Sequence, residues 1–174
     1  MKHLQHTVVA LASLLPLADS AHGAITGHID ARLIITAACE VSAGGGELPG
    51  SLGELDFGNQ GPTWNAPLSS RLSSGDGALN VTCNPSVKGF TVTIDGGTHG
   101  DGSIRRLSNG RQTIPYRLSV DAAGLDTYSI GQQRTFAVSD GTQRPIPVYG
   151  VVVANTSALP AGVYSDTLTV TLDW

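Results

Sequence analysis

Residues that could carry acid–base or nucleophilic chemistry are few in this 174-residue chain. Beyond residue 23 the histidines are His28 and His99, and no Gly-x-Ser-x-Gly motif accompanies them to expose a nucleophilic serine. His28 stands in a run where polar and apolar residues alternate, which indicates a solvated side chain. A Ser-His-Asp site built on His99 would depend on partners brought in by the fold, because triad members need not be neighbours in sequence. We therefore expect that the chain is not an enzyme.

Oxygen ligands gather in residues 95–103 (DGGTHGDGS), where a calcium ion is conceivable because Ca²⁺ prefers carboxylate and carbonyl oxygens. The segment lacks the spacing of an EF-hand loop, so a flexible hairpin connection without metal is the expected structure. No pair of carboxylates is spaced as acid and base for glycoside hydrolysis. Trp64 could stack on a sugar, but packing within its loop is the preferred interpretation. The sequence thus predicts neither a metal nor a cofactor.

Residues 1–23 have the composition of a signal peptide. Lys2 gives a short basic start, residues 8–17 (VVALASLLPL) are apolar, and residues 21–23 (AHG) place small side chains where a signal peptidase cleaves. This apolar run is too short to cross a bilayer as a helix, which takes about 20 residues. We expect the mature chain to begin at Ala24 and to be exported without membrane insertion.

Cys39 and Cys83 both lie in the exported part of the chain. Two cysteines that enter an oxidising compartment usually pair, so a Cys39–Cys83 disulfide is predicted. In the chain-entropy model the loop that it closes would stabilise the fold by about 3–4 kcal/mol. Two cysteines without nearby histidines cannot build a zinc site. The net charge of −4, without a basic patch, argues against nucleic acid as a partner.

The mature part has the pattern of an all-β protein. Glycine accounts for 22 of 174 residues, and turn dipeptides such as Asn109-Gly110 separate short stretches rich in Val, Ile, Leu and Thr. Alternating strands are expected at 78–83, 90–94, 114–120 and 168–174, and a strand covered on both faces at 146–153. Within the third of these, Arg117 and Ser119 are expected to face solvent.

The first and last strands are the most informative. The final stretch places Leu168, Val170, Leu172 and Trp174 on one face. Near the N-terminus the alternation is almost strict, with the apolar row Ile25, Gly27, Ile29, Ala31, Leu33 and Ile35. In extended form this segment spans roughly 36 Å at about 3.3 Å per residue, whereas strands of globular domains usually have about five or six residues. The alternation alone leaves two interpretations open: the first strand of its own sandwich, or a strand that enters the sheet of another subunit.

Eight stretches in a characteristic order carry a resemblance to a known family. They are 24–30 (AITGHID), 39–41 (CEV), 55–58 (LDFG), 64–65 (WN), 81–83 (VTC), 90–97 (FTVTIDGG), 148–150 (VYG) and 160–168 (PAGVYSDTL). Each stretch is weak alone, but their order, their spacing and the aromatic final strand are specific together. The sequence resembles the major pilins of archaic (Csu-type) chaperone–usher pili, which belong to the spore coat protein U domain family.

The resemblance implies an immunoglobulin-like β-sandwich that lacks its last strand and is completed by a strand from a neighbouring subunit or a chaperone. It implies that residues 24–36 form an N-terminal donor strand, whose apolar row from Ile25 to Ile35 binds the next subunit. Residues 37–174 would then be the pilin domain, in which Leu168, Val170, Leu172 and Trp174 flank the acceptor groove. In the family a periplasmic chaperone lends a strand first, and an outer-membrane usher exchanges it for a donor strand.

The function that the resemblance implies is structural. The chain would polymerise by donor-strand complementation, with identical or related pilin subunits, into a surface pilus used for adhesion and biofilm formation. Its other partners would be the chaperone and the usher, and it would reach the cell surface through the periplasm. Two alternatives stay open: a minor or tip adhesive subunit, and a secreted coat protein of the same family that forms no pilus.

Overall fold

The structure, a computed structural model, describes residues 25–42, 50–73, 77–139 and 141–174. The predicted signal peptide and its cleavage before Ala24 lie outside these residues. The chain divides into two units, Met1–Ile34 and Ile35–Trp174. In the first unit, residues 25–34 contain no strand and are exposed. The described strands all belong to the second unit.

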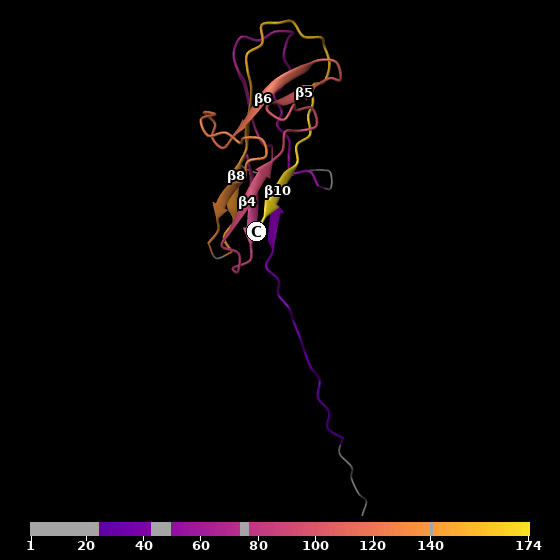
Figure 1. Ribbon diagram of the computed structural model, residues 1–174, viewed down its shortest axis with the longest axis vertical. Coiled ribbons are helices and arrows are strands. Elements are labelled where there is room, and N and C mark those ends of the chain that lie inside the picture. Colours follow the sequence, from indigo (N-terminus) through magenta and orange to yellow (C-terminus); the bar gives the residue numbers. More distant parts are fainter. Residues whose placement is uncertain (1–24, 43–49, 74–76, 140) are drawn as a thin grey trace, which may run out of the picture. The chain divides into compact units, whose positions relative to one another are not determined.

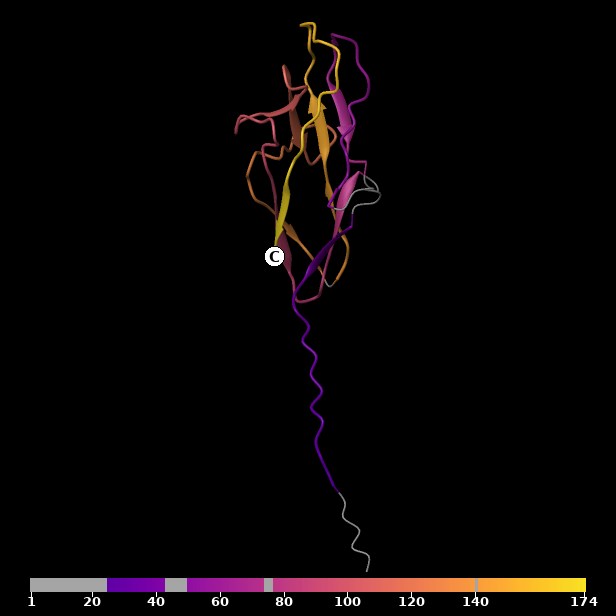
Figure 2. The same ribbon diagram turned by 90° about the vertical axis from the view of Figure 1, so that its right-hand side faces the viewer.

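The described strands of the second unit are short and pair only in antiparallel fashion (Figures 1 and 2). They are β1 (Cys39–Ser42), β2 (Leu68–Arg71), β3 (Ala78–Cys83), β4 (Gly89–Ile94), β5 (Arg105–Ser108), β6 (Thr113–Ser119), β7 (Arg134–Ala137), β8 (Arg144–Pro147), β9 (Tyr149–Val152) and β10 (Val170–Asp173). They form three sheets with the orders β1-β3-β8, β10-β4-β7 and β2-β9-β6-β5. The described residues contain no helix, and hence none long and apolar enough to cross a membrane. The predicted all-β class is therefore confirmed.

Three predicted strands, β3, β4 and β6, lie where the period-two alternation placed them. Side chains on one face of each strand enter the core, because successive residues of a strand point to opposite faces. In β6, Arg117 is exposed as expected, but Ser119 is only 2% exposed. The prediction for Ser119 was wrong because its hydroxyl donates a hydrogen bond of 2.8 Å to the Asp121 carbonyl, so this polar side chain is satisfied without water.

The predicted strand 146–153 is divided in two at Val148. Among the described strands β8 pairs only with β3 and is an edge strand, which suits Pro145 and Pro147 because proline cannot donate to a ladder. β9 lies between β2 and β6 in a different sheet. The chain therefore passes from one sheet to another within a few residues.

One hydrophobic core connects the sheets. Its members with at most 2% exposure come from β3, β4, β6, β8 and β9, and they are Leu79, Val81, Cys83, Phe90, Val92, Ile94, Leu118, Ile146 and Val152. Strand β10 covers only residues 170–173 of the predicted strand 168–174. Trp174, which was predicted to share the inward face of this strand, is 58% exposed because the ladder with β4 ends at Asp173.

Candidate functional site

Strands β1 and β10 each have one unpaired edge among the described strands. β1 pairs only with β3, and β10 pairs only with β4. Both views place the two strands at the same end of the second unit (Figures 1 and 2). A row of unpaired backbone groups on such an edge can accept a further strand.

The core is incompletely covered beneath these two edges. Val170 and Leu172 of β10 are half-buried, whereas Ile94 and Val92, which lie opposite them on β4, are 2% and 0% exposed. Val41 of β1 is also half-buried, although its neighbours on β3 belong to the fully buried core. The apolar faces at the two edges thus retain surface that another strand could bury.

The open edge at the C-terminal side is longer than β10 itself. Ser165 exchanges two backbone hydrogen bonds with Ser108 of β5, of 2.9 and 3.0 Å, and the carbonyls of Thr167 and Thr169 accept from Thr98 and Asp95. Odd-numbered residues therefore direct their backbone groups toward the body of the domain. Even-numbered residues from 164 to 172 point their side chains inward and, because backbone groups alternate along an antiparallel strand, direct their N–H and C=O groups toward the open edge.

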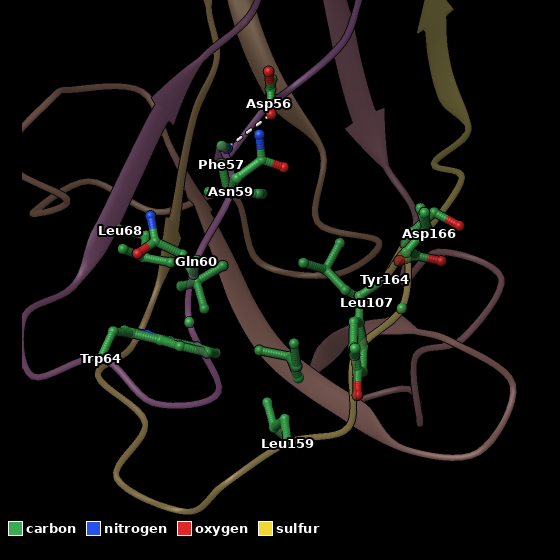
Figure 3. A pocket seen from close by; sticks show the side chains of 18 of the residues that line it. Asp56, Phe57, Asn59, Gln60, Trp64, Leu68, Leu107, Leu159, Tyr164 and Asp166 are labelled. Carbon is green, nitrogen blue, oxygen red and sulfur yellow. Dashed lines mark hydrogen bonds between the residues drawn. The ribbon is translucent and has the colours of Figure 1, made fainter.

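A cavity of about 750 Å³ lies between two segments of the second unit (Figure 3). One wall consists of residues 54–62 and the other of residues 159–166. Apolar side chains contributed by four separate parts of the chain line it, namely Leu68, Leu107, Ile114 and Val152. We call this cavity, together with the unpaired edges of β1 and β10, the groove. Its N-terminal wall consists of β1 and residues 54–62, and its C-terminal wall consists of residues 159–173.

Leu55 and Phe57 form the inner surface of the N-terminal wall over β9. A Cβ atom added to Gly150 would lie 2.7 Å from Phe57 Cζ and 3.2 Å from Leu55 Cδ1, so these side chains pack directly on the glycine backbone. The Phe57 ring lies 6.3 Å from that of Tyr116, measured between centroids. Only glycine at position 150 leaves room for this arrangement.

A buried carboxylate stands in the C-terminal wall. The Asp166 side chain is 1% exposed, accepts a hydrogen bond of 2.8 Å from the Tyr116 hydroxyl and one of 3.0 Å from the His99 amide, and lies 3.3 Å from His99 Nδ1. Burial, followed by the hydrogen bond to Asp166, raises the pKa of Tyr116 well above its usual value. The neutral hydroxyl is therefore a constant donor to this carboxylate.

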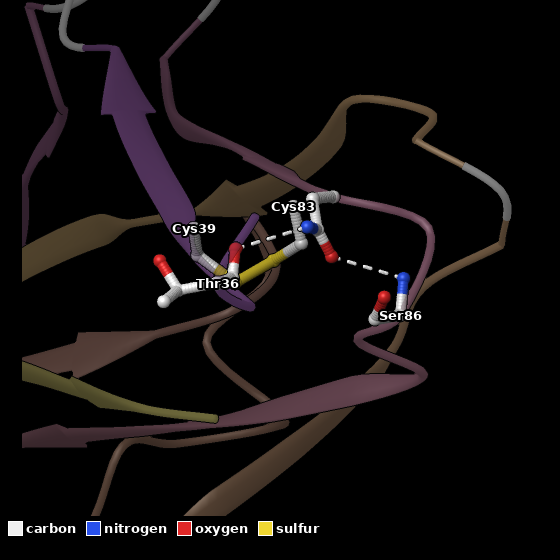
Figure 4. The surroundings of a disulfide bond; sticks show 5 residues. Thr36, Cys39, Cys83 and Ser86 are labelled. Carbon is white, nitrogen blue, oxygen red and sulfur yellow. Dashed lines mark hydrogen bonds between the residues drawn. A yellow bond between two sulfur atoms is a disulfide. The ribbon is translucent and has the colours of Figure 1, made fainter. Parts of the chain in front are cut away.

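The predicted disulfide is present between Cys39 of β1 and Cys83 of β3 (Figure 4). Next to it, Asn84 donates from its backbone to the Ala38 carbonyl at 2.9 Å and from Nδ2 to the Thr36 carbonyl at 3.1 Å. These bonds continue the β1–β3 pairing back to Thr36. The N-terminal wall of the groove is therefore fastened covalently.

The comparisons with known proteins bear on this geometry. The family model described as "Spore Coat Protein U domain" matches residues 25–171. This chain belongs to that family. The family is described by a coat protein, and the chain is not an enzyme. No curated protein matches the sequence.

Among solved structures, this chain is similar to a chain in the crystal structure of the CsuC–CsuE chaperone–tip adhesion subunit pre-assembly complex. That complex comes from archaic chaperone–usher Csu pili of Acinetobacter baumannii. The match has a TM-score of 0.54 and 18% identity, and it covers 80% of this chain and 40% of that chain. The likeness shows a shared fold, and this chain spans less than half the length of its counterpart.

The residues predicted for the donor strand precede the residues of the groove in the sequence. Ile25, Ile29 and Leu33 are 101%, 97% and 84% exposed, and Ile35 is 79% exposed. Ala31 is also exposed, and nothing lies within 4 Å of the position of a Cβ on Gly27. Of the predicted groove-flanking residues, Leu168, Val170 and Leu172 face inward and Trp174 does not.

Sequence reasoning missed most of the groove. Residues 54–62 form a wall through contacts with strands that lie far away in the sequence, and Asp166 appeared only as one letter of a matched stretch. The alternation of Leu55 and Phe57 was a usable signal, because both side chains are half-buried while Glu54 and Asp56 are exposed. No local pattern reveals that Gly150 supports them.

The other chemical candidates have structural explanations. His99 pairs with Asp166, but no serine hydroxyl in the described residues hydrogen-bonds to it. The described residues contain no cluster of three or more metal-ligating side chains, and Asp101 instead accepts hydrogen bonds from the amides of Ser103 and Ile104. Trp64 bonds to a segment outside its own loop, because Nε1 donates to the Val153 carbonyl at 2.9 Å and its backbone exchanges hydrogen bonds with Asn155.

Proposed function

We propose that the mature chain is a structural subunit of a chaperone–usher surface pilus, joined to its neighbours by donor-strand complementation. Residues 24–36 of one copy enter the groove of the next, and the apolar row Ile25, Gly27, Ile29, Ala31, Leu33 and Ile35 faces its core. The domain is an incomplete immunoglobulin-like sandwich that this strand completes. The observation that carries the proposal is the pair of unpaired edges, β1 and β10, over half-buried apolar side chains.

The C-terminal wall of the groove and the N-terminal donor segment agree in length and in chemistry. The C-terminal wall from Tyr164 to Asp173 and the segment from Ile25 to Ile35 have nearly equal lengths, roughly 30–36 Å at about 3.3 Å per residue. Full burial of the four large side chains of the segment would be favourable by roughly 6–12 kcal/mol. The even-numbered backbone groups of the wall would complete a ladder with the incoming strand. Release of the strand would open a folded core, so the joint would be kinetically durable.

The same geometry favours a subunit of the shaft over one at the tip. A shaft subunit needs both halves of a joint, because it receives one neighbour and enters another. This chain has both a groove and an exposed, alternating N-terminal segment. A tip subunit needs only the groove. A secreted coat protein of the same family is the remaining alternative, and immunogold labelling along pili separates it from both pilus roles.

A groove that is open before assembly requires a temporary occupant, since unpaired edges over apolar side chains promote aggregation. We infer that a periplasmic chaperone supplies a strand and that an outer-membrane usher exchanges it, so export leads to the cell surface. The name of the similar Csu complex, a chaperone–tip adhesion subunit pre-assembly complex, supports this order of events.

The test is to place a charge on the inward row of the donor segment. In cells that also produce chaperone and usher, Ile29→Asp and Leu33→Asp should abolish pili in electron micrographs and remove the high-mass ladder on denaturing gels. The chaperone complex should still form, because the groove is unchanged.

The matched controls are His28→Asp and Arg32→Asp, which place the same charge on the outward row. They should assemble within about twofold of the unmodified chain, because an outward charge stays solvated. Normal pili from Ile29→Asp and Leu33→Asp would refute the donor assignment, and equal loss in all four variants would show that the segment acts through charge alone.

A further inference from the structure

The loop at residues 95–100 and the C-terminal wall exchange carboxylate hydrogen bonds in both directions. Asp95 lies on the loop, and its Oδ1 accepts from the Thr169 amide of the wall at 2.9 Å. Asp166 lies on the wall, and its Oδ1 accepts from the His99 amide of the loop at 3.0 Å. Each segment thus supplies one carboxylate that binds the backbone of the other.

Two further contacts lie between these carboxylates. The Thr98 amide donates to the Thr167 carbonyl at 3.0 Å, and the Asp95 amide donates to the Thr169 carbonyl at 3.1 Å. We call these four connections the clasp: Asp95–Thr169 through side chain and through backbone, Thr98–Thr167, and His99–Asp166. On the wall the clasp uses the backbone groups of Thr167 and Thr169 and the inward side chain of Asp166, and it leaves the open edge free.

Gly97 and Arg105 accommodate the carboxylates of Asp95 and Asp166. Gly97 lies against the Asp166 carboxylate with a φ of +78°, and a Cβ at this position would overlap Oδ2, so a side chain fits neither the space nor the backbone. The Arg105 guanidinium, on a residue that is 4% exposed, donates to the carbonyls of Asp95 and Tyr128 at 2.8 and 2.7 Å. It balances the buried negative charge while its own donors are satisfied, as a buried ion requires.

We propose that Asp95 and Asp166 are positioning residues that keep the C-terminal wall ready to receive a strand while the groove is empty. β10 pairs with β4 over only four residues and has no neighbour on its other edge among the described strands, so an edge strand of this kind would fray. The clasp extends the attachment by a further four residues, from 166 to 169. This inference deepens the proposed function and rests on it.

The test measures amide hydrogen exchange at single residues in the full mature chain, before assembly and in the fibre. In Asp166→Ala, exchange at Thr169 should accelerate about tenfold or more, although the acceptor of that amide, Asp95, is untouched. In Asp95→Ala, exchange at His99 should accelerate similarly, although its acceptor Asp166 remains. In each variant, exchange is measured at the amide whose acceptor carboxylate is still present. Faster exchange there shows that the clasp is cooperative, whereas the loss of one hydrogen bond alone would leave that amide unchanged.

Three further variants complete the design. Asp101→Ala is the matched control, because Asp101 also caps amides in this loop but its bonds stay within residues 103–106; it should leave Thr169 unchanged. Asp95→Asn keeps an acceptor oxygen and should restore slow exchange. Tyr116→Phe removes one donor to Asp166 without disturbing the packing, and should give an intermediate acceleration.

The clasp should also act on assembly. Asp166→Ala should slow fibre elongation about tenfold, whereas Asp101→Ala should not. Equal acceleration at all core amides of β3 and β6 would mean general destabilisation and would overturn the proposal, as would unchanged exchange at Thr169. The proposed function is tested separately, because amides of Leu168, Val170 and Leu172 in the unmodified chain should gain protection on assembly. If they do not, donor complementation fails even where the clasp is present.

Discussion

Cys39 and Cys83 lie directly opposite each other in the β1–β3 ladder and are joined by a disulfide. The two walls of the groove are thus attached in different ways. The N-terminal wall has a covalent link next to the site where the predicted donor segment ends, whereas the C-terminal wall depends on hydrogen bonds. Each attachment makes its own prediction.

Replacement of both cysteines, in Cys39→Ser with Cys83→Ser, should destabilise the chain by about 2–5 kcal/mol, because the unfolded state regains the entropy that the closed loop removes. Denaturant unfolding of the mature chain measures the difference. The reduced, unmodified chain is the matched control and should unfold at the same concentration as the double variant. An unchanged midpoint would show that β1 does not depend on the disulfide.

Gly150→Ala should destabilise the chain by about 1–3 kcal/mol, because the added methyl group overpacks the site against Phe57 and Leu55. Gly61→Ala is the matched control, since the nearest atom to its added Cβ is the Thr63 carbonyl oxygen at 3.9 Å. Phe57→Leu combined with Gly150→Ala should recover part of the loss by making room. Equal thermal midpoints for Gly150→Ala and Gly61→Ala would contradict this packing.

Cysteine labelling should report burial of the inward row on assembly. Ile29→Cys should react with a maleimide in the monomer, where Ile29 is 97% exposed, and should be protected in the fibre. His28→Cys, on the neighbouring outward position, should react in both states. Protection of both residues, or of neither, would mean that the segment does not lie in the groove as an alternating strand.

Acid should weaken the C-terminal wall. Burial would raise the pKa of Asp95, but hydrogen bonds from the Thr169 and Gly97 amides outweigh it and hold that pKa below 3.8. A lowered pKa in the folded chain means that the stabilisation is present above the unfolded value and is lost as the pH falls from about 4 through the folded pKa. Thermal unfolding between pH 6 and 2 should therefore be less steeply pH-dependent in Asp95→Asn, and identical slopes would count against this role.

Alkali should destabilise the chain through Tyr128. Burial raises its pKa to about 12, and its hydroxyl donates to the Pro147 carbonyl at 2.9 Å. The unfolded tyrosine ionises from about pH 10 upward while the folded one stays neutral, so stability should fall by roughly 2–3 kcal/mol between pH 10 and 12. Denaturant unfolding of Tyr128→Phe should show a smaller fall, and an equal fall would assign the effect to other groups.

The sequence was sufficient for the elements whose side chains alternate over six or more residues. β3, β4 and β6 were predictable because one face of each is buried, and burial of one face imposes period two on the residues that fill it. The Cys39–Cys83 disulfide was predictable because two cysteines of an exported chain usually pair in an oxidising compartment. The four-residue strands β1, β2, β5 and β7 were not predicted, since so short a stretch carries too little periodicity to distinguish a strand from a loop.

Local pattern alone determined that this protein is all-β, bears one disulfide, and has an apolar alternating segment near its N-terminus. Only the tertiary structure decided that residues 54–62 and 159–166, about a hundred positions apart, form two walls of one cavity. It also decided that Asp166 is buried between Tyr116 and His99, and that Trp174 remains exposed. The physical reason is that alternation records which face of a strand is buried, whereas the identity of its neighbours depends on which distant segments complete the same core.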